Sequence, residues 1–445
     1  MKLSNLFKKT TAVAAEVNYP KIPRLDYEHN AYEGYIDHCD DNSVRGWAFH
    51  RERPDEPLEL LIKDGDSILA TITADQNRDD LKALGKGNGK HGFSFDFPHT
   101  IKNCEPHILH VQYADTGRDL YRSPVVQPLF PADPQQKREH LIAHQIALCQ
   151  GASPLSAEQL RAMQVFRNEH FPRPEHLPWL DQPDWSEQIE QRFADGSLTQ
   201  AEAALCREFA ERGYVIVNDI IADKELDQAW DAFMQSWRDG KLPMRPRPPT
   251  HDAKWGRVGN IHRLLPEMDA ILRHPKLVAL IELLLGVPCL PFQTIPSFIG
   301  SEQLAHSDAI HMTTFPLGYL AAAWIAFEDI HPDSGPLEYY PGSHRLPYYL
   351  GEATGLSLQQ IRTQGRHAYE TIYEPFIQQA VQDHGLERKY FTAKKGEILI
   401  WHHNLLHGGS KIKDPSTTRE SLVCHYFGKQ AVCYHDLVGE LAYVS

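Results

Sequence analysis

Several features are scarce or missing in this sequence of 445 residues, and each absence removes a class of protein. Its seven cysteines are odd in number and never closer than nine positions, so no CxxC pair exists. A disulfide framework or a cysteine zinc site is therefore not expected, and we predict a reducing, cytoplasmic location. No apolar run reaches the roughly 20 residues of a membrane helix. The longest, Leu317 to Phe327, predicts a buried strand, and residues 1–17 lack the continuous apolar stretch of a signal peptide.

The charge balance is acidic, with 45 basic and 59 acidic side chains and a net charge of −14. Such a surface repels phosphate backbones and anionic lipids, so neither nucleic acid nor a membrane surface is an expected partner. Hydrophobic residues at 42% and charged residues at 23% are typical of a globular protein, and the length suits two or three domains. The composition names no protein partner and no oligomeric state.

The first third of the chain predicts a polar leader and a small β domain. Residues 1–30 are polar and are expected to be poorly ordered. Residues 31–129 contain short β-rich runs, with a hairpin signal at Asp64-Gly65-Asp66 and a period-two pattern that places Phe93, Phe95 and Phe97 on one face. We predict a small antiparallel β-sandwich here, and because it holds no acid, base or metal cluster, we expect a binding or assembly module.

Two further regions follow. Residues 130–197 predict a partly helical connector, with a capping box at Ser156 to Gln159. Residues 198–445 open with a second capping box, Thr199 to Glu202, ahead of a helix that ends before Gly213. Short β-rich runs then continue to the C-terminus, interrupted by a more helical insert around Leu356 to His384. The expected fold class is therefore mainly β with packed helices.

The third region holds a candidate metal site. In an extended strand, residues i and i+2 project to the same side, so His306 and Asp308 can reach one ion. A third ligand is available in His407, which follows the apolar strand at Ile398 to Trp401. Two neutral imidazoles and one carboxylate on one face are the ligands of an oxygen-activating iron(II) site, although zinc could use the same set for hydrolysis. His402 and His403, directly after that strand, are alternative ligands.

A cationic group that can bind a carboxylate lies twelve positions beyond His407. Arg419 enters the apolar strand Leu422 to Phe427. A guanidinium stays protonated and binds both oxygens of a carboxylate, so Arg419 is the natural group for the distal carboxylate of a dicarboxylic acid.

Together these residues closely resemble the phytanoyl-CoA dioxygenase family over roughly Leu198 to Phe427. The resemblance rests on His306-x-Asp308, Ala323-Trp324-Ile325-Ala326-Phe327, Ser334-Gly335-Pro336-Leu337-x-x-x-Pro341-Gly342-Ser343-His344, His407 and Arg419. It implies a C-terminal double-stranded β-helix (jelly roll) and a facial triad of His306, Asp308 and His407. It also implies that Arg419 and Ser421 hold 2-oxoglutarate and that Trp324 lines that pocket.

The same resemblance implies the chemistry. The cofactor would be Fe(II), with 2-oxoglutarate and O2 as cosubstrates, and the reaction would be that of a hydroxylase. With Asp308 filling its coordination position no site is left there for halide, so hydroxylation outranks halogenation. The sequence departs from the family pattern at Ser307, where Gln is frequent, which puts a cosubstrate contact from that position in doubt. The long insert before His407 leaves the substrate pocket open.

Two features bear on the substrate. Segments Gly34 to Asp37, Val44 to Ala48, Arg78 to Leu81 and His91 to Phe93 resemble a β-sandwich module appended to bacterial glycosyltransferases, which suggests a saccharide-linked substrate by association. Between residues 241 and 263 the chain has six basic residues and only Asp252 as an acid, which favours an anionic small molecule. The alternative to an enzyme is a non-catalytic interaction or glycan-binding protein that keeps the jelly roll as a scaffold.

Overall fold

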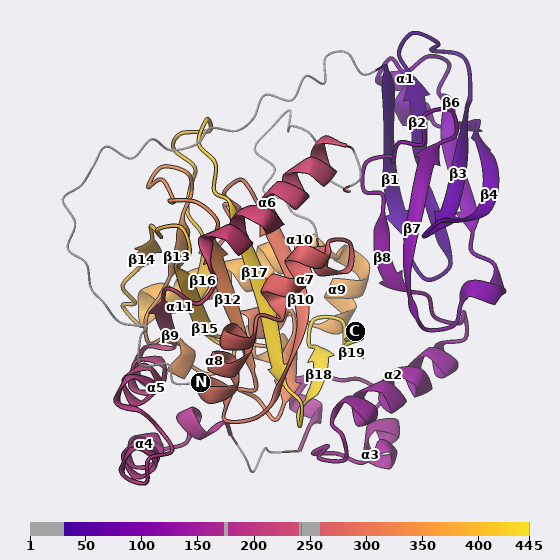
Figure 1. Ribbon diagram of the computed structural model, residues 1–445. Helices are drawn as coiled ribbons and strands as arrows, with labels where there is room; N and C mark the ends of the chain where they lie inside the picture. The colour runs from indigo at the N-terminus through magenta and orange to yellow at the C-terminus, as the bar shows by residue number, and fades with distance from the viewer. Residues whose placement is uncertain (1–30, 173–176, 240–241, 243–258, 445) are drawn as a thin grey trace. The chain divides into compact units, whose positions relative to one another are not determined.

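The structure is a computed structural model that describes residues 31–172, 177–239, 242 and 259–444 (Figure 1). It divides into two compact units. The larger holds Leu141–Ala229 and Gly259–Val444, and the smaller holds most of the chain before Leu141. The predicted leader and most of the basic stretch 241–263 lie outside the described residues. The predicted domain limits at 129/130 and 197/198 stay predictions.

The smaller unit contains a β-sandwich of two four-stranded antiparallel sheets. The first has the order β1-β2-β6-β5 and the second β4-β3-β7-β8. Their inner faces share one core, which includes Ile36, Phe93, Leu60 and Val111, with Phe95 packed against it. The predicted small antiparallel sandwich is thus observed, and its hairpin turns between Asp64 and Ser67 as expected. The strand bounds are β1 Tyr32–Cys39, β2 Ser43–His50, β3 Leu58–Asp64, β4 Ser67–Ala74, β5 Gln76–Asn77, β6 Lys90–Asp96, β7 Pro106–Tyr113 and β8 Val125–Pro128.

The larger unit is built on a five-stranded antiparallel sheet with the order β10-β17-β12-β15-β9. The bounds are β9 Tyr214–Val217, β10 Cys289–Ser297, β12 Leu320–Ala326, β15 Ile398–His402 and β17 Ser421–Gly428. A second sheet, β14-β13-β16, is made of Lys389–Phe391, Leu337–Tyr339 and His407–Gly409. A third, β11-β18-β19, is made of Thr313–Phe315, Val432–His435 and Glu440–Leu441.

The five-stranded sheet and the β14-β13-β16 sheet pack face to face. One core joins them, with Trp324 from β12, Trp401 from β15, Tyr339 from β13 and Phe391 from β14. Helix α8 (Pro275–Leu285) contacts the five-stranded sheet at β10, β12 and β17. Strand β12 therefore has both faces covered, which explains why all seven of its residues are buried. This two-layer arrangement of antiparallel sheets confirms the mainly β class with packed helices.

Two helices begin where the capping boxes in the sequence predict. Helix α3 has the capping box of Ser156 and Gln159, and α5 has that of Thr199 and Glu202, with Gly213 as a left-handed C-cap. The helix bounds are α1 Asp79–Ala83, α2 Pro134–Leu148, α3 Ala157–Ala162, α4 Trp185–Ala194, α5 Gln200–Arg212, α6 Asp223–Arg238, α7 Pro266–Leu272, α9 Leu358–Gln364, α10 Arg366–Ala368 and α11 Glu374–Asp383. No helix among the described residues is both long and apolar enough to cross a membrane.

The turn at Gly213 generates a stability prediction. Gly213 has φ +79°, and a Cβ built there would lie 2.4 Å from Nδ1 of His344. Gly196 has φ +78°, and a Cβ built there would have no other atom within 4 Å. Gly196→Ala should therefore lose only the left-handed conformational term of about 1–2 kcal/mol. Gly213→Ala should lose a further ~1–3 kcal/mol through steric overlap. Urea unfolding of both variants measures the difference, and equal losses would contradict the predicted clash.

Candidate metal centre

His306 and His407 are brought together by backbone pairing. The two residues form an antiparallel bridge in which each amide N–H donates to the other's carbonyl oxygen at 2.9 Å. Strand β16 therefore continues against the segment that leads into Asp308. The glycines after His407 permit this approach, because a Cβ at Gly408 would lie 2.6 Å from the Gln303 carbonyl oxygen. The glycines thus let one chain segment pass close to another.

Asp308 faces the same point as the two histidines. Ser307 is extended, with φ −101° and ψ 149°, so the side chains on either side of it project to one side. One ligand atom from each of His306, Asp308 and His407 lies within 4.8 Å of the others. The structure therefore brings together the three residues that the sequence marks as candidate ligands, although His407 lies about 100 positions from the other two in the chain.

The tautomers of both histidines fit a metal. Nδ1 of His306 donates to the carbonyl oxygen of Leu304, and Nδ1 of His407 donates to that of Leu405, each at 2.9 Å. In a neutral imidazole with Nδ1 protonated, Nε2 carries the lone pair. Both Nε2 atoms are thus available as ligands. The amide of Gln303 lies 3.2 Å from Nε2 of His306, which places a polar side chain at the centre.

The carboxylate of Asp308 is held through one of its oxygens. Nε1 of Trp401 donates to Oδ2 at 2.8 Å, and Nε2 of His425 lies 3.6 Å from the same oxygen. The other oxygen, Oδ1, lies 3.5 Å from Nε2 of His407. One oxygen is therefore oriented by the protein and the other faces the histidines. This is the arrangement in which outer groups fix a ligand and tune its basicity.

Protonation also suits metal binding. Burial lowers the pKa of His306 well below 6.5, and the neighbouring His407 and His311 lower it further. Burial would raise the pKa of Asp308, but His407 and His425 outweigh it, and the pKa falls well below 3.8. At neutral pH the site therefore presents a neutral imidazole and an ionised carboxylate, the forms that bind a divalent ion. The donor set of two nitrogens and one oxygen fits Fe(II).

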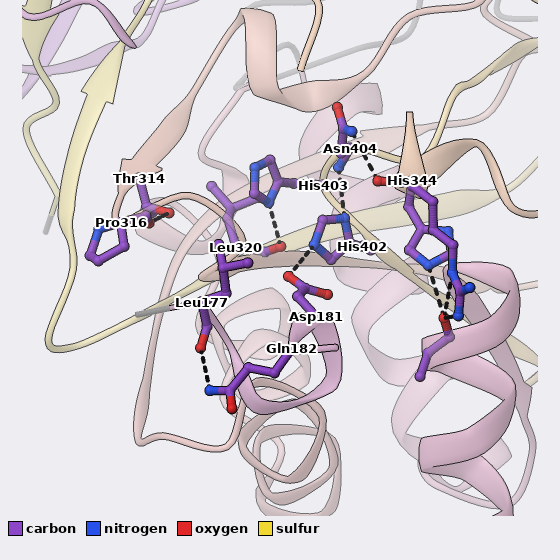
Figure 2. Close-up of polar contacts among 12 residues, drawn as sticks. Leu177, Asp181, Gln182, Thr314, Pro316, Leu320, His344, His402, His403 and Asn404 are labelled. Atoms are coloured by element: carbon purple, nitrogen blue, oxygen red, sulfur yellow. Dashed lines mark hydrogen bonds and ion pairs between the residues drawn. The ribbon is translucent and has the colours of Figure 1, made fainter. Parts of the chain in front are cut away.

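The alternative ligands His402 and His403 lie outside this cluster. Figure 2 shows their side chains at the end of β15, among Asp181, Leu320 and His344. Nε2 of His402 donates to Asp181 at 3.2 Å, since its Nδ1 accepts from the amide of Asn404. Nδ1 of His403 donates to the carbonyl oxygen of Leu320 at 3.0 Å. Both histidines are thus engaged in structural hydrogen bonds.

Arg419, Trp324 and Ser421 occupy the same inner region of the larger unit. The buried guanidinium of Arg419 donates through Nη1 to the Gly335 carbonyl oxygen at 3.0 Å and lies 5.9 Å from the centre of the Trp324 ring. The hydroxyl of Ser421 lies 3.4 Å from two backbone carbonyl oxygens, those of Ser297 and Arg419. A role of these residues toward 2-oxoglutarate stays a prediction.

The buried carboxylate of Glu328 forms hydrogen bonds with the residues on both sides of Arg419. It accepts from the hydroxyl of Thr418 at 2.8 Å and from the amide of Glu420 at 2.7 Å. Burial raises its pKa to about 7, against the partial compensation of these two donors.

Sequence reasoning missed Trp401, His425, Gln303 and Glu328. The sequence carried a signal for His425. Trp401 pairs with Ala322, which pairs with His425, so the three lie in one row across the five-stranded sheet. Stepping by two from Arg419 along β17 reaches His425 on the same face. Gln303 and Glu328 lie in irregular segments, where no periodicity indicates the direction of a side chain.

The fold and this buried His-Asp-His cluster define a mainly β protein with a candidate mononuclear metal site. Residues 209–419 match the family model described as Phytanoyl-CoA dioxygenase (PhyH). These residues therefore form a domain of the phytanoyl-CoA dioxygenase family, and the span includes all three candidate ligands and ends at Arg419.

Individual relatives match shorter stretches. Phytanoyl-CoA dioxygenase domain-containing protein 1 of Rattus norvegicus is 34% identical over 112 residues, 24% of this chain and 35% of that protein. The Danio rerio protein of the same name is 35% identical over 65 residues, 15% of this chain and 20% of that protein. The match to these curated relatives thus spans about a third of their length or less.

Among solved structures, the 2-oxoglutarate-dependent carbocyclase SnoK from nogalamycin biosynthesis aligns with 16% identity and a TM-score of 0.43. The alignment covers 56% of this chain and 95% of SnoK. EctD from S. alaskensis aligns with 18% identity and a TM-score of 0.41, covering 56% and 83%.

Trp401→Phe tests the support of Asp308. The variant keeps an aromatic ring but removes the donor to Oδ2, so we expect Fe(II) affinity to fall about 10–100-fold. Anaerobic Fe(II) titration measures this, and Trp185→Phe on α4 serves as the matched control. Wild-type affinity in Trp401→Phe would show that the indole hydrogen bond does not orient the ligand.

Glu328→Gln tests the buried carboxyl. Its folded pKa of about 7 lies above the unfolded value near 4.5, so the native state holds the proton more tightly. The protonated Glu328 carboxyl therefore contributes to the free energy of unfolding below about pH 4.5. This contribution, roughly 2–3 kcal/mol, is lost as the pH rises through 7. The free energy of unfolding between pH 5 and 8 should vary less in Glu328→Gln by that amount. Glu187→Gln, at an exposed position of α4, should leave the profile unchanged, and an unaltered slope in Glu328→Gln would refute the assignment.

Proposed function

We propose that the larger unit is an Fe(II)- and 2-oxoglutarate-dependent dioxygenase that hydroxylates a C–H bond of a small molecule. The observation that carries the proposal is the convergence of His306, Asp308 and His407, with ligand atoms within 4.8 Å of one another, inside a family domain at residues 209–419. Membership of the family supports oxygenase chemistry, and hydroxylation is the part that this proposal adds.

The bound ion, with 2-oxoglutarate and O2, would supply the oxidising chemistry. The protein residues supply binding, orientation and exclusion of water. His306, Asp308 and His407 would hold the ion through two imidazole nitrogens and one carboxylate oxygen. Trp401 and His425 hold the carboxylate of Asp308 in place. The apolar core shared by the two sheets surrounds Trp324 and Trp401 and keeps water from the site.

Arg419 would bind the distal carboxylate of 2-oxoglutarate. Arg419 is only 4% exposed, and its guanidinium lies beside Trp324, where a carboxylate would be desolvated and strongly attracted. Ser421 is the weaker candidate, since its hydroxyl already faces two backbone carbonyl oxygens.

For the substrate we propose an anionic or saccharide-linked small molecule. The support is the basic stretch 241–263 and the resemblance of the N-terminal sandwich to modules of glycosyltransferases. Arg245→Ala and Arg257→Ala should raise the substrate KM, and an unchanged KM would remove the anionic preference from the proposal.

The decisive experiment is anaerobic addition of Fe(II) and 2-oxoglutarate, followed by O2. Wild-type protein should show the weak visible band of the iron–keto acid complex and should then release succinate. His407→Ala should lose at least ~100-fold in Fe(II) affinity, more than loss of an outer partner costs. His367→Ala, at an exposed position of α10, should behave as wild type. A wild-type protein with neither band nor succinate would favour the non-catalytic interaction protein.

A further inference from the structure

The helical insert between β13 and β14 contains a π-helix at Tyr369–Tyr373. Such turns are rare and occur frequently at functional sites. The rings of Tyr369 and Tyr373 stack on one side of this turn, with centroids 4.9 Å apart and an interplanar angle of 22°. The insert thereby presents two phenol hydroxyls side by side.

Tyr373 contacts the peptide between two candidate metal ligands. Its side chain is fully buried, and its hydroxyl oxygen accepts a hydrogen bond from the amide of Ser307 at 3.3 Å. Ser307 stands between His306 and Asp308 and is itself 2% exposed. Because the chain is extended there, Ser307 projects to the side opposite the ligands, toward the insert.

Tyr369 contacts the ligand segment further along the chain, at His311. Its hydroxyl lies 3.3 Å from Nε2 of His311, and the two rings are 5.2 Å apart. The amide of His311 donates to the carbonyl oxygen of Asp308 at 2.9 Å, and its ring packs edge-on against that of His306 at 5.5 Å. The insert therefore holds the ligand segment both between and just after the two ligands.

A shared apolar core reinforces these contacts. It combines Tyr369, Tyr373 and Ile377 of the insert with residues that flank the candidate ligands. Ala305 and Ala309 flank the His306–Asp308 segment, and Leu406 precedes His407. The insert thus packs against the residues that flank the candidate ligands.

We propose that Tyr373 and Tyr369 are positioning residues that hold the His306–Asp308 segment in its metal-binding geometry. The insert then acts as a support of the metal centre. This inference rests on the proposed function, because it presupposes that the three ligands bind an ion.

The test uses the full chain, Fe(II), Co(II) and 2-oxoglutarate. Tyr373→Phe keeps the buried ring but removes the acceptor for the Ser307 amide. We expect Fe(II) affinity to fall about 10-fold, the lower end for loss of an outer partner. The visible bands of the Co(II) protein and of the Fe(II)–2-oxoglutarate complex should also shift, because they report ligand geometry. Unfolding of the metal-free protein should stay cooperative.

Tyr349→Phe is the matched control. It removes a hydroxyl that also contacts a histidine, 3.2 Å from Nε2 of His384, on the exposed side of the same region. Affinity and spectra of this variant should equal those of wild type. Should Tyr373→Phe fail to fold, Tyr369→Phe provides the second measurement, with a several-fold loss of affinity and a shifted Co(II) spectrum expected.

The outcomes separate the two proposals. Wild-type affinity and spectra in both Tyr373→Phe and Tyr369→Phe would overturn the positioning role and leave the dioxygenase proposal standing. Equal weakening by Tyr349→Phe would also overturn it, since the effect would then be general to the insert. A wild-type protein that binds neither Fe(II) nor Co(II) would overturn both proposals together.

Discussion

The candidate metal centre depends on one backbone interaction, the antiparallel bridge between His306 and His407. Two reciprocal hydrogen bonds join segments that are about 100 residues apart, and they place both imidazoles on the same side. Once that pairing exists, the extended backbone at Ser307 brings Asp308 to the same point. The two sheets, the glycines after His407 and the insert all contribute to the precision of this bridge.

Placing a carboxylate in this environment carries an electrostatic cost, because burial disfavours the charged form. The structure offsets it with oriented donors. Trp401 hydrogen-bonds to Oδ2 of Asp308, and His425 lies near the same oxygen, the two residues flanking Ala322 in one row of the five-stranded sheet. The same sheet therefore supplies the apolar wall and the polar groups that stabilise the charge. A bound divalent ion would add the largest local charge and would complete the compensation.

The helical insert between β13 and β14 lies against the segment that holds two of the candidate ligands. Of its two stacked tyrosines, Tyr373 accepts a hydrogen bond from the amide of Ser307 and Tyr369 contacts His311. Because these contacts come from a helical segment outside the sheets, substitutions in that segment can change the position of the ligands without altering the strands.

The sequence alone determined the class of fold, the local signals and the identities of the candidate ligands. Alternating apolar residues predicted the N-terminal sandwich, capping boxes predicted the starts of α3 and α5, and the run from Leu317 to Phe327 predicted the buried β12. These features depend on periodicity and on contacts within a few residues, which a sequence displays directly.

Only the tertiary structure decided which histidine meets the His306–Asp308 pair and which groups support them. His402, His403 and His407 are equivalent by composition, and strand register alone turns the last toward Asp308 and the others toward Asp181 and Leu320. Trp401 and Tyr373 reach the site through contacts between distant segments. Register and long-range packing depend on the closure of the whole sheet, so no local pattern encodes them.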